Sequence, residues 1–389
     1  MSFIKKIRKS LIEKRFFKTL FNKLYPYYKG FLLVFLFQKN KIQIFSPKKS
    51  VIEKKDIPLA ERIFKSFKLM KSEQESKSSL YKASSMWQNH IDKDFSFLKE
   101  SYEKDDLEKF LFFLQNFGNW NRYLGIEEQI LIKKYSNNIF LKRFLKDQIF
   151  QGQYKLWKYI NQDDDYSNLN FPRYGNQNGA FIGDSFVVIG SFFNHIYAKM
   201  IANFLNKDKK NLIIDLGGGY GKLGYYILKN TKNSTFIDFD IPETLVLASY
   251  YLSKCYPNKK NFFYGEENFN ANTLLNYDLV FLPPWEIEKI ENNSIQLTIN
   301  KNSLGEMEPD TAKNYLNHIH RISKYFFSLN HESFRNKFDN GKKSLINREY
   351  NEHGVFKQLF RYPDLGHLTY ENNKINLEND IFVYLYEKS

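Results

Sequence analysis

One short segment, residues 212–224, limits the fold of this 389-residue chain more than any other. It reads Leu-Ile-Ile-Asp-Leu-Gly-Gly-Gly-Tyr-Gly-Lys-Leu-Gly, an apolar run that enters a glycine-dense turn and continues into a helical pattern. Glycine lets the backbone turn tightly and lets a ligand approach without a Cβ clash, and the next helix begins with free N–H groups. The segment therefore predicts a strand, a ligand-binding turn and a helix.

Strand and helix patterns alternate after this turn, which predicts an α/β fold with a doubly wound parallel sheet. We expect strands over 235–239, 278–282, 295–300 and 325–330, and helices over 243–255 and 309–324. Residues 262–264 receive no assignment. Two β-rich runs, 367–371 and 381–387, close the chain and are expected to form a final antiparallel hairpin.

The residues before the sheet are predicted to be helical. Leu107, Phe110, Leu111, Leu114 and Phe117 recur at helical spacing, and Trp87 and Trp120 are expected in the core of this region rather than on a sugar-stacking surface. A polar stretch, 163–178, breaks the periodicity and is interpreted as a linker or lid. The predicted parts are a basic amphipathic segment (1–50), a helical N-terminal domain (51–178) and the sheet domain (179–389).

The positive charge is concentrated at the N-terminus. Residues 1–50 hold 13 Lys or Arg against one acid, Glu13, and so carry most of the formal charge of +15. The rest of the chain is close to neutral, which argues against the long basic groove of a nucleic-acid enzyme. Residues 3–24 form a basic amphipathic pattern with two open interpretations: a helix on an anionic membrane surface, or a helix packed on the protein.

Cysteine content and apolar runs bear on the compartment. Cys255 is the single cysteine, which excludes an internal disulfide and a multi-cysteine zinc site; no metal is expected. The N-terminus lacks the unbroken apolar region of a signal peptide, and no apolar run approaches the roughly 20 residues of a membrane span. We expect a cytoplasmic protein, with the inner face of the cell membrane as its site if residues 3–24 bind lipid. The oligomeric state is not predicted.

Two ligands compete for the glycine turn. Gly219, Gly221 and Gly224 satisfy the spacing that binds a dinucleotide pyrophosphate, which keeps an NAD(P)-dependent oxidoreductase as an alternative. Asp215, two residues before Gly217, completes the pattern Asp-x-Gly-x-Gly-x-Gly, which resembles motif I of the class I methyltransferases. The resemblance implies S-adenosylmethionine, held by Asp215, Gly217, Gly219 and Gly221. A carboxylate there suits a cationic methionine amine and repels a pyrophosphate.

A second acid follows the next strand. Asp240, about 20 residues beyond the glycines, is expected to accept hydrogen bonds from both ribose hydroxyls, with Asp238 as its competitor. The alternative is an acid that only caps the helix opened by Pro242. Trp285, in Pro-Pro-Trp after a later strand, is expected either in the adenine wall or in the ordinary core.

The candidate substrate residues follow the last two parallel strands. Asn302 is expected to orient the substrate, and Glu306 or His331 to remove a proton from the accepting hydroxyl. His331 is the first choice, because it follows strand 325–330 and so lies at the carboxyl edge of the sheet, where such folds bind ligands. The alternatives are a structural role for His331, and for Glu306 a position at the start of the next helix.

Several segments together resemble the bacterial sugar O-methyltransferases found among surface-polysaccharide genes. They are Trp87, Asn116-Phe117, Asp215 to Gly221, Phe239-Asp240-Ile241-Pro242, Phe281-Leu-Pro-Pro-Trp285 and Asn302-Ser303-Leu304-Gly305-Glu306-Met307. The resemblance spans residues 85–335. It implies a class I methyltransferase fold and methyl transfer to a sugar hydroxyl of a surface polysaccharide or of its lipid-linked or nucleotide-linked precursor. A protein of this fold that only binds a glycan is a further alternative.

Overall fold

The computed structural model describes residues 24, 42–50, 52–126, 150, 152–162, 164–352, 354–366, 370–371, 374–375 and 380–389. The basic helix predicted over residues 3–24 lies outside the described residues, except for Leu24. In the described ranges, no helix combines the length and apolar character that crossing a bilayer requires.

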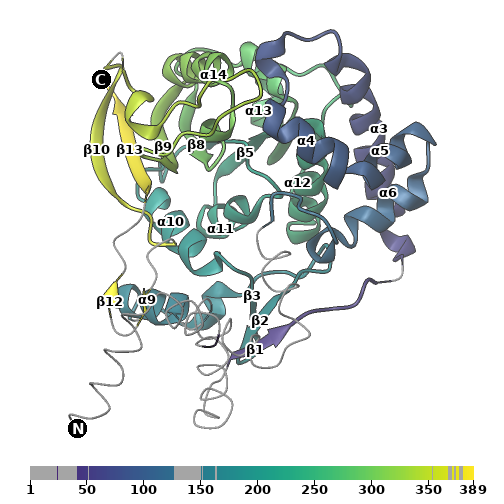
Figure 1. Cartoon of the computed structure of the whole chain (residues 1–389), viewed down its shortest axis with the longest axis horizontal. Helices are drawn as coiled ribbons and strands as arrows, with labels where there is room; N and C mark the ends of the chain where they lie inside the picture. Colours follow the sequence, from purple (N-terminus) through teal and green to yellow (C-terminus); the bar gives the residue numbers. More distant parts are fainter. Residues whose placement is uncertain are drawn as a thin grey trace.

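An eight-stranded sheet forms the centre of the molecule (Figure 1), in the order β10-β13-β9-β8-β4-β5-β7-β6. The six consecutive strands from β9 to β6 run parallel to one another. β13 is antiparallel to both β9 and β10. The predicted Rossmann-like doubly wound sheet is therefore confirmed. The strands are β4 (Asn211–Leu216), β5 (Ser234–Phe239), β6 (Asn261–Phe263), β7 (Leu279–Leu282), β8 (Ile295–Lys301), β9 (Ser323–His331), β10 (Phe356–Pro363) and β13 (Ile381–Lys388).

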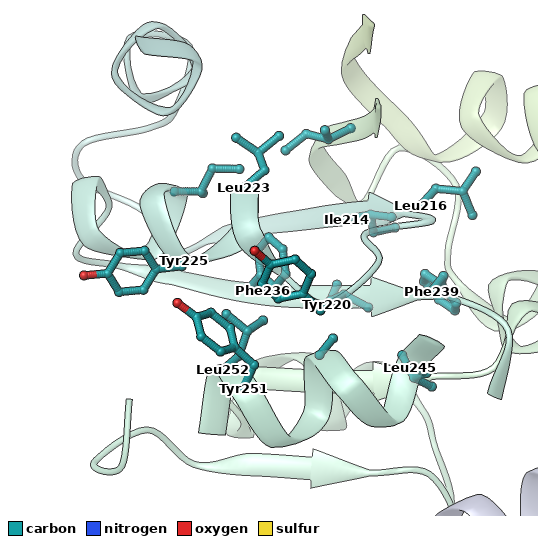
Figure 2. Close-up of a cluster of buried hydrophobic side chains, with 14 of the residues drawn as sticks. Ile214, Leu216, Tyr220, Leu223, Tyr225, Phe236, Phe239, Leu245, Tyr251 and Leu252 are labelled. Carbon is teal, nitrogen blue, oxygen red and sulfur yellow. The ribbon is translucent and has the colours of Figure 1, made fainter. Parts of the chain in front are cut away.

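Helices cover both faces of this sheet. All six residues of β5 are buried, as expected for a parallel strand covered on both faces. Gly224, in the helix after the glycine turn, allows that helix to pack closely on β5, because a Cβ at position 224 would lie only 2.6 Å from the Phe236 ring. Figure 2 shows Leu223, Tyr251 and Leu252 in the apolar layer around Phe236. The helices of this part are α10 (Ser191–Ala202), α11 (Lys222–Asn230), α12 (Pro242–Cys255), α13 (Ala271–Asn276) and α14 (Pro309–Ile322).

The prediction that residues 367–371 form a hairpin with the last strand is wrong. β10 pairs with β13 instead, and Tyr370–Glu371 (β11) pairs with Lys374–Ile375 (β12) in a separate two-stranded sheet. β10 is an edge strand in which half of the residues are exposed, with a register shift between Gln358 and Phe360. The shift in register interrupts the regular alternation of side chains by which a strand is recognised from sequence alone.

The N-terminal region is helical, as predicted. Its helices α3 (Ile57–Gln74), α4 (Ser85–Asp94), α5 (Ser96–Glu103) and α6 (Leu107–Leu114) lie beside the sheet domain in Figure 1, and α3 packs against α12. Asp56, at the start of α3, is buried. It accepts a hydrogen bond from the Tyr250 hydroxyl at 2.7 Å and forms an ion pair with Lys254. This contact joins the two regions. A further helix, α9 (Gly152–Ile160), packs against α10.

The polar stretch 163–178 packs, over its described part, on both the sheet domain and the N-terminal helical region, where the Gly118 N–H donates to the Gly175 carbonyl at 2.7 Å. Its interpretation as a linker or lid stays a prediction. Leu169 and Phe171 are buried, and the Tyr226 hydroxyl donates to the Leu169 carbonyl at 2.7 Å. The segment leads into a small antiparallel sheet of β1 (Ile42–Phe45), β2 (Gly179–Ile182) and β3 (Ser185–Val187).

Candidate functional site

A cavity of about 510 Å³ opens at the carboxyl ends of β4, β5, β8 and β9. This is where doubly wound sheets bind their ligands. The cavity brings together most of the residues that the sequence singled out, although those residues are up to 116 positions apart between Asp215 and His331. The predicted site residues on its wall are Asp215, Gly217, Gly219, Asp240, Asn302, Glu306 and His331.

The glycine turn connects β4 to α11, and each of its three predicted glycines has a positive φ, which other residues adopt with strain. Gly219 (φ 63°) faces open space, since a Cβ there would meet no atom within 4 Å. Gly221 does not line the cavity; a Cβ there would lie 2.8 Å from the Leu252 side chain. Gly219 thus permits a ligand to approach, whereas Gly221 permits helix packing.

The N–H groups of these glycines are already bonded inside the protein. The Gly217 N–H donates to the Phe239 carbonyl at 2.8 Å, and the Gly221 N–H donates to the Gly218 carbonyl at 3.1 Å. The Gly219 N–H donates to the Asp240 carboxylate at 2.9 Å. None of the three is therefore directed at a ligand, although a pyrophosphate site would need such donors.

Asp215, near the end of β4, is 2% exposed and yet lines the cavity. Its Oδ1 atom has no hydrogen-bond partner among the described residues. Burial, followed by the nearby charge of Asp240, raises the pKa of Asp215 to about 7. A buried carboxyl with an unused oxygen is suited to a cationic ligand group, because ionisation then becomes favourable.

Asp240 and its competitor Asp238 occupy different places. Asp240 lines the cavity, and its carboxylate also accepts the N–H of Ile241 at 2.7 Å. Asp238 is fully buried and does not line the cavity; its Oδ1 would lie 2.9 Å from a Cβ on Gly218. Helix α12 begins at Pro242 without a side-chain cap. Asp240 thus faces the ligand space, and the capping alternative is not observed.

Trp285 does not line the cavity. It is 5% exposed, its ring lies 6.3 Å from that of Tyr264, and the Lys77 ammonium lies over it at 5.4 Å. The core alternative is the one that the structure shows, and Pro284 takes the place on the cavity wall. Both residues belong to the short helix Pro284–Lys289.

Glu306 is joined to the N-terminal helical region. The Trp87 indole Nε1 donates to the Glu306 carboxylate at 2.7 Å, and both side chains line the cavity. Trp87 is partly buried and packs against the core, so its expected place in the core is confirmed only in part. Tyr81 and Tyr123 from the same region also line the cavity. The sequence pattern does not predict that these residues reach the cavity, because their contact with it depends on how the N-terminal helices pack against the sheet domain.

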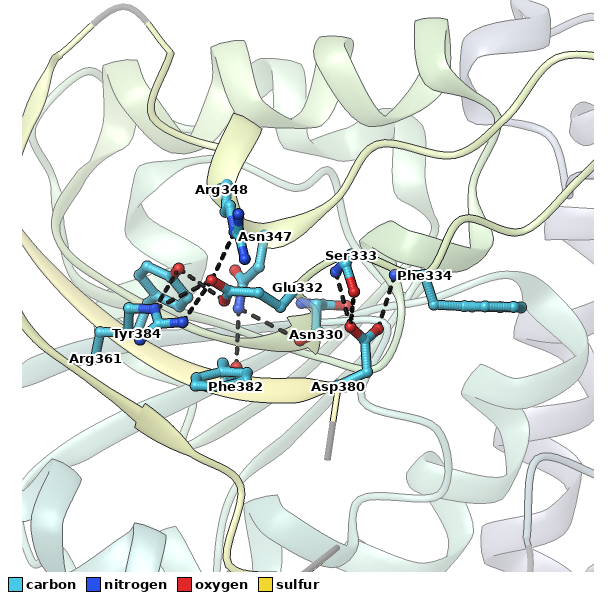
Figure 3. Close-up of polar contacts among 10 residues, drawn as sticks. All are labelled: Asn330, Glu332, Ser333, Phe334, Asn347, Arg348, Arg361, Asp380, Phe382 and Tyr384. Carbon is cyan, nitrogen blue, oxygen red and sulfur yellow. Dashed lines mark hydrogen bonds and ion pairs between the residues drawn. The ribbon is translucent and has the colours of Figure 1, made fainter. Parts of the chain in front are cut away.

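His331 forms a pair with Asp380. The His331 Nδ1 lies 3.0 Å from the Asp380 Oδ2. Figure 3 shows that Asp380 also accepts the N–H groups of Ser333 and Phe334, at 3.0 and 2.8 Å. Burial would raise the pKa of Asp380, but the hydrogen bonds from these three residues together lower it. Asp380 was missed. It precedes Ile381, which is the partner of His331 in the β9–β13 ladder, so only the strand register identifies it.

Glu332, the next residue, does not line the cavity and belongs to a separate network of polar contacts (Figure 3). It is 3% exposed and accepts hydrogen bonds from Arg361 at 2.7 Å, Arg348 at 2.7 Å and the Tyr384 hydroxyl at 2.8 Å. Because these three donors satisfy its charge, the Glu332 carboxylate can remain ionised in a buried position. The network fixes the end of β9 and therefore the position of His331.

Comparison with known proteins gave structural similarity only. No protein-family model and no curated protein matches the chain. Solved structures that match include the mitomycin 7-O-methyltransferase MmcR (12% identity, TM-score 0.33, 51% of this chain and 57% of that one) and a TehB-like SAM-dependent methyltransferase from Corynebacterium glutamicum (13%, 0.32, 51% and 88%). A family 2 O-methyltransferase from Planctomyces limnophilus matches with 12% identity and a TM-score of 0.32 over 49% of this chain and 56% of that one. Similarity at this level carries no inference about substrate.

Proposed function

We propose that this protein is an S-adenosylmethionine-dependent methyltransferase that acts on a sugar hydroxyl of a surface polysaccharide or its precursor. One observation carries the proposal: Asp215, whose carboxylate has an unpartnered oxygen, lines the same cavity as Asp240 and as His331, which is paired with Asp380. The two carboxylates suit binding of the methyl donor, and the His331–Asp380 pair suits removal of a proton from the methyl acceptor.

The residues present fit the donor. Asp215 would accept the methionine ammonium, and Asp240, already held by the Gly219 N–H, would accept the ribose hydroxyls. The open face of Gly219 leaves room for the ligand to lie against the backbone. When bound, S-adenosylmethionine supplies a methyl group activated by the sulfonium.

The same geometry disfavours the oxidoreductase alternative. A dinucleotide pyrophosphate needs free N–H groups at the turn, and those of Gly217, Gly219 and Gly221 are bonded within the protein. It would also meet the Asp215 carboxylate, whose negative charge in the ionised form repels it. Both features are compatible with a donor that brings a cation and hydroxyls.

His331 would act as general base. A carboxylate beside Nδ1 keeps the proton on that nitrogen and leaves Nε2 as the acceptor, so Asp380 orients the ring for proton removal. His331 would take the hydroxyl proton as the acceptor oxygen forms its bond to the methyl carbon. Most of the rate would come from positioning the acceptor, since the methyl group is already activated.

The sugar assignment is supported by the resemblance of the 302–307 segment and by the Trp87–Glu306 pair on the cavity wall. An indole face and a carboxylate are the groups that bind the apolar face and the hydroxyls of a sugar ring. The test is transfer of a labelled methyl group from S-adenosylmethionine to a panel of methyl hexopyranosides. Binding of glycosides without transfer would favour the glycan-binding alternative, and saturable binding of NADH would favour the oxidoreductase.

A further inference from the structure

Phe334 is an exposed aromatic residue beside the proposed general base. It lies three residues beyond the end of β9 and is 54% exposed, and its ring centroid lies 5.0 Å from that of His331. His331 lines the cavity, whereas Phe334 does not. The Phe334 ring therefore lies at the rim of the cavity, next to the group that would take the proton from the acceptor hydroxyl.

The backbone at Phe334 is held by the same carboxylate that pairs with His331. Asp380 accepts the Phe334 N–H at 2.8 Å and the Ser333 N–H at 3.0 Å, and its Oδ2 lies 3.0 Å from the His331 Nδ1. Figure 3 shows the Phe334 ring extending away from this carboxylate. One acid thus fixes the imidazole and the exposed ring relative to each other.

The segment after Phe334 is anchored as well. The Asn336 Nδ2 donates to the Gly305 carbonyl at 2.8 Å, and both Gly305 and Glu306 line the cavity. The segment that carries Phe334 is therefore bonded on one side to the pair that includes His331 and on the other side to the candidate substrate loop. The ring is held in place before any ligand binds, which lowers the entropy cost of binding.

The exposure of this ring acquires a meaning from its position, because single exposed apolar residues are common on protein surfaces. An aromatic ring packs its apolar face against the C–H face of a sugar, while the sugar hydroxyls stay in water. We propose that Phe334 stacks against the sugar next to the one that is methylated, so that the acceptor is a glycan of at least two linked sugars. This inference rests on the proposed function, because it takes His331 as the group that faces the reacting hydroxyl.

The charge beside the ring favours a neutral glycan over a nucleotide-linked sugar. Burial would raise the pKa of Asp380, but the hydrogen bonds that its carboxylate accepts together lower it, so the carboxylate is ionised at neutral pH. The nearest cation along the chain, Arg335, is bonded to Glu349 at 2.9 Å. A phosphate placed at the Phe334 ring would be repelled by the Asp380 carboxylate, whereas a neutral sugar would not.

The test compares the methyl glycosides of glucose, mannose and galactose with disaccharides of the same sugars as methyl acceptors, and includes nucleotide-linked hexoses as the competing class. The variants are Phe334→Ala, which removes the ring, and Phe334→Tyr, which keeps it; both retain the N–H that Asp380 accepts. Tyr159→Ala is the control, because Tyr159 is an aromatic residue that is 75% exposed and does not line the cavity.

The readout is the ratio of kcat/KM for a disaccharide to that for its single sugar. In the wild type, Phe334→Tyr and Tyr159→Ala, this ratio should reach about 3–12 for at least one disaccharide, since covering about half of a phenyl ring gives about half of the free energy of burying a whole one. In Phe334→Ala the ratio should fall below about two, with normal affinity for S-adenosylmethionine. A ring that only supports His331 would lower kcat/KM for both acceptors alike and leave the ratio unchanged.

Three results would each overturn the glycan assignment: no preference for disaccharides in the wild type, an unchanged preference in Phe334→Ala, or a preference of the wild type for nucleotide-linked hexoses. Failure to bind S-adenosylmethionine, or binding of this donor without transfer to any sugar, would instead contradict the proposed function itself, and the inference with it.

Discussion

The Asp240 carboxylate accepts the backbone N–H of Gly219 at 2.9 Å, across 21 residues of sequence. The bond ties the end of β5 to the turn after β4 and places a carboxylate beside the open face of the glycine. It also removes a donor that a phosphate ligand would need. One contact therefore shapes the turn and selects the kind of ligand it accepts.

Replacing Asp240 by Asn should weaken binding of S-adenosylmethionine by about 1–3 kcal/mol, or roughly 5–150-fold, because a charged hydrogen-bond partner of the ribose is lost. Calorimetric titration measures this directly. Asp238→Asn is the matched control, since Asp238 is as close to the turn but off the cavity. Loss of binding in Asp238→Asn with normal binding in Asp240→Asn would reverse the assignment.

Donor binding should weaken as the pH falls. Burial raises the pKa of Asp215 to about 7, so the free protein carries a protonated carboxyl below that pH. An ammonium group binds the ionised form, so binding releases the proton and the dissociation constant should rise about tenfold per pH unit between pH 7 and pH 5.5. Titrations in buffers of different ionisation enthalpy would detect this proton.

The Asp215→Asn variant should bind the donor more weakly at pH 7.5 and should lose most of this pH dependence. Because the pKa of Asp240 is also raised, to about 6, mainly by burial, a smaller dependence at the acid end should remain. A wild-type affinity that stays constant from pH 7.5 to pH 5.5 would show that Asp215 does not pair with a cation.

His331→Ala should lower kcat for methyl transfer by about 10²–10⁴-fold while leaving donor affinity unchanged, since a general base acts on the acceptor alone. Asp380→Asn should have a smaller effect of the same kind, because it only orients the ring. The pair His90–Asp94 is a control: its Nδ1–Oδ2 distance is 2.8 Å and neither residue lines the cavity. A His90→Ala defect as large as that of His331→Ala would point to stability rather than catalysis.

Trp87→Phe keeps an aromatic ring on the cavity wall but removes the hydrogen bond to Glu306. We expect the acceptor KM to rise about 3–10-fold, in line with loss of one hydrogen bond, with donor affinity unchanged. Trp285→Phe serves as the comparison, because its indole is buried away from the cavity. A fall in donor affinity in Trp285→Phe would restore the adenine-wall assignment.

Local patterns in the sequence predicted the parts of the site that lie next to one another along the chain. The strand, turn and helix of 212–224 and the acid at the end of β5 depend on short-range periodicity and on glycine geometry, which a single segment displays. The same patterns placed five of the six parallel strands; the short β6, near the unassigned residues 262–264, was missed.

The residues that were missed depend on contacts between distant segments. Asp380 reaches His331 through the register of β13 against β9, and Trp87 reaches Glu306 through helix docking. No periodicity encodes such pairings. β10 was missed for another reason, since its shift in register interrupts the regular alternation of side chains.

The central claim is tested most directly by calorimetric titration with S-adenosylmethionine of the wild type, Gly219→Arg and Gly354→Arg. The two glycines are matched, with φ values of 63° and 64° and no atom within 4 Å of a Cβ, but only Gly219 lines the cavity. The account predicts a dissociation constant on the order of micromolar for the wild type and Gly354→Arg, and no binding by Gly219→Arg. A folded wild type that does not bind, or a Gly219→Arg variant that binds normally, would contradict it.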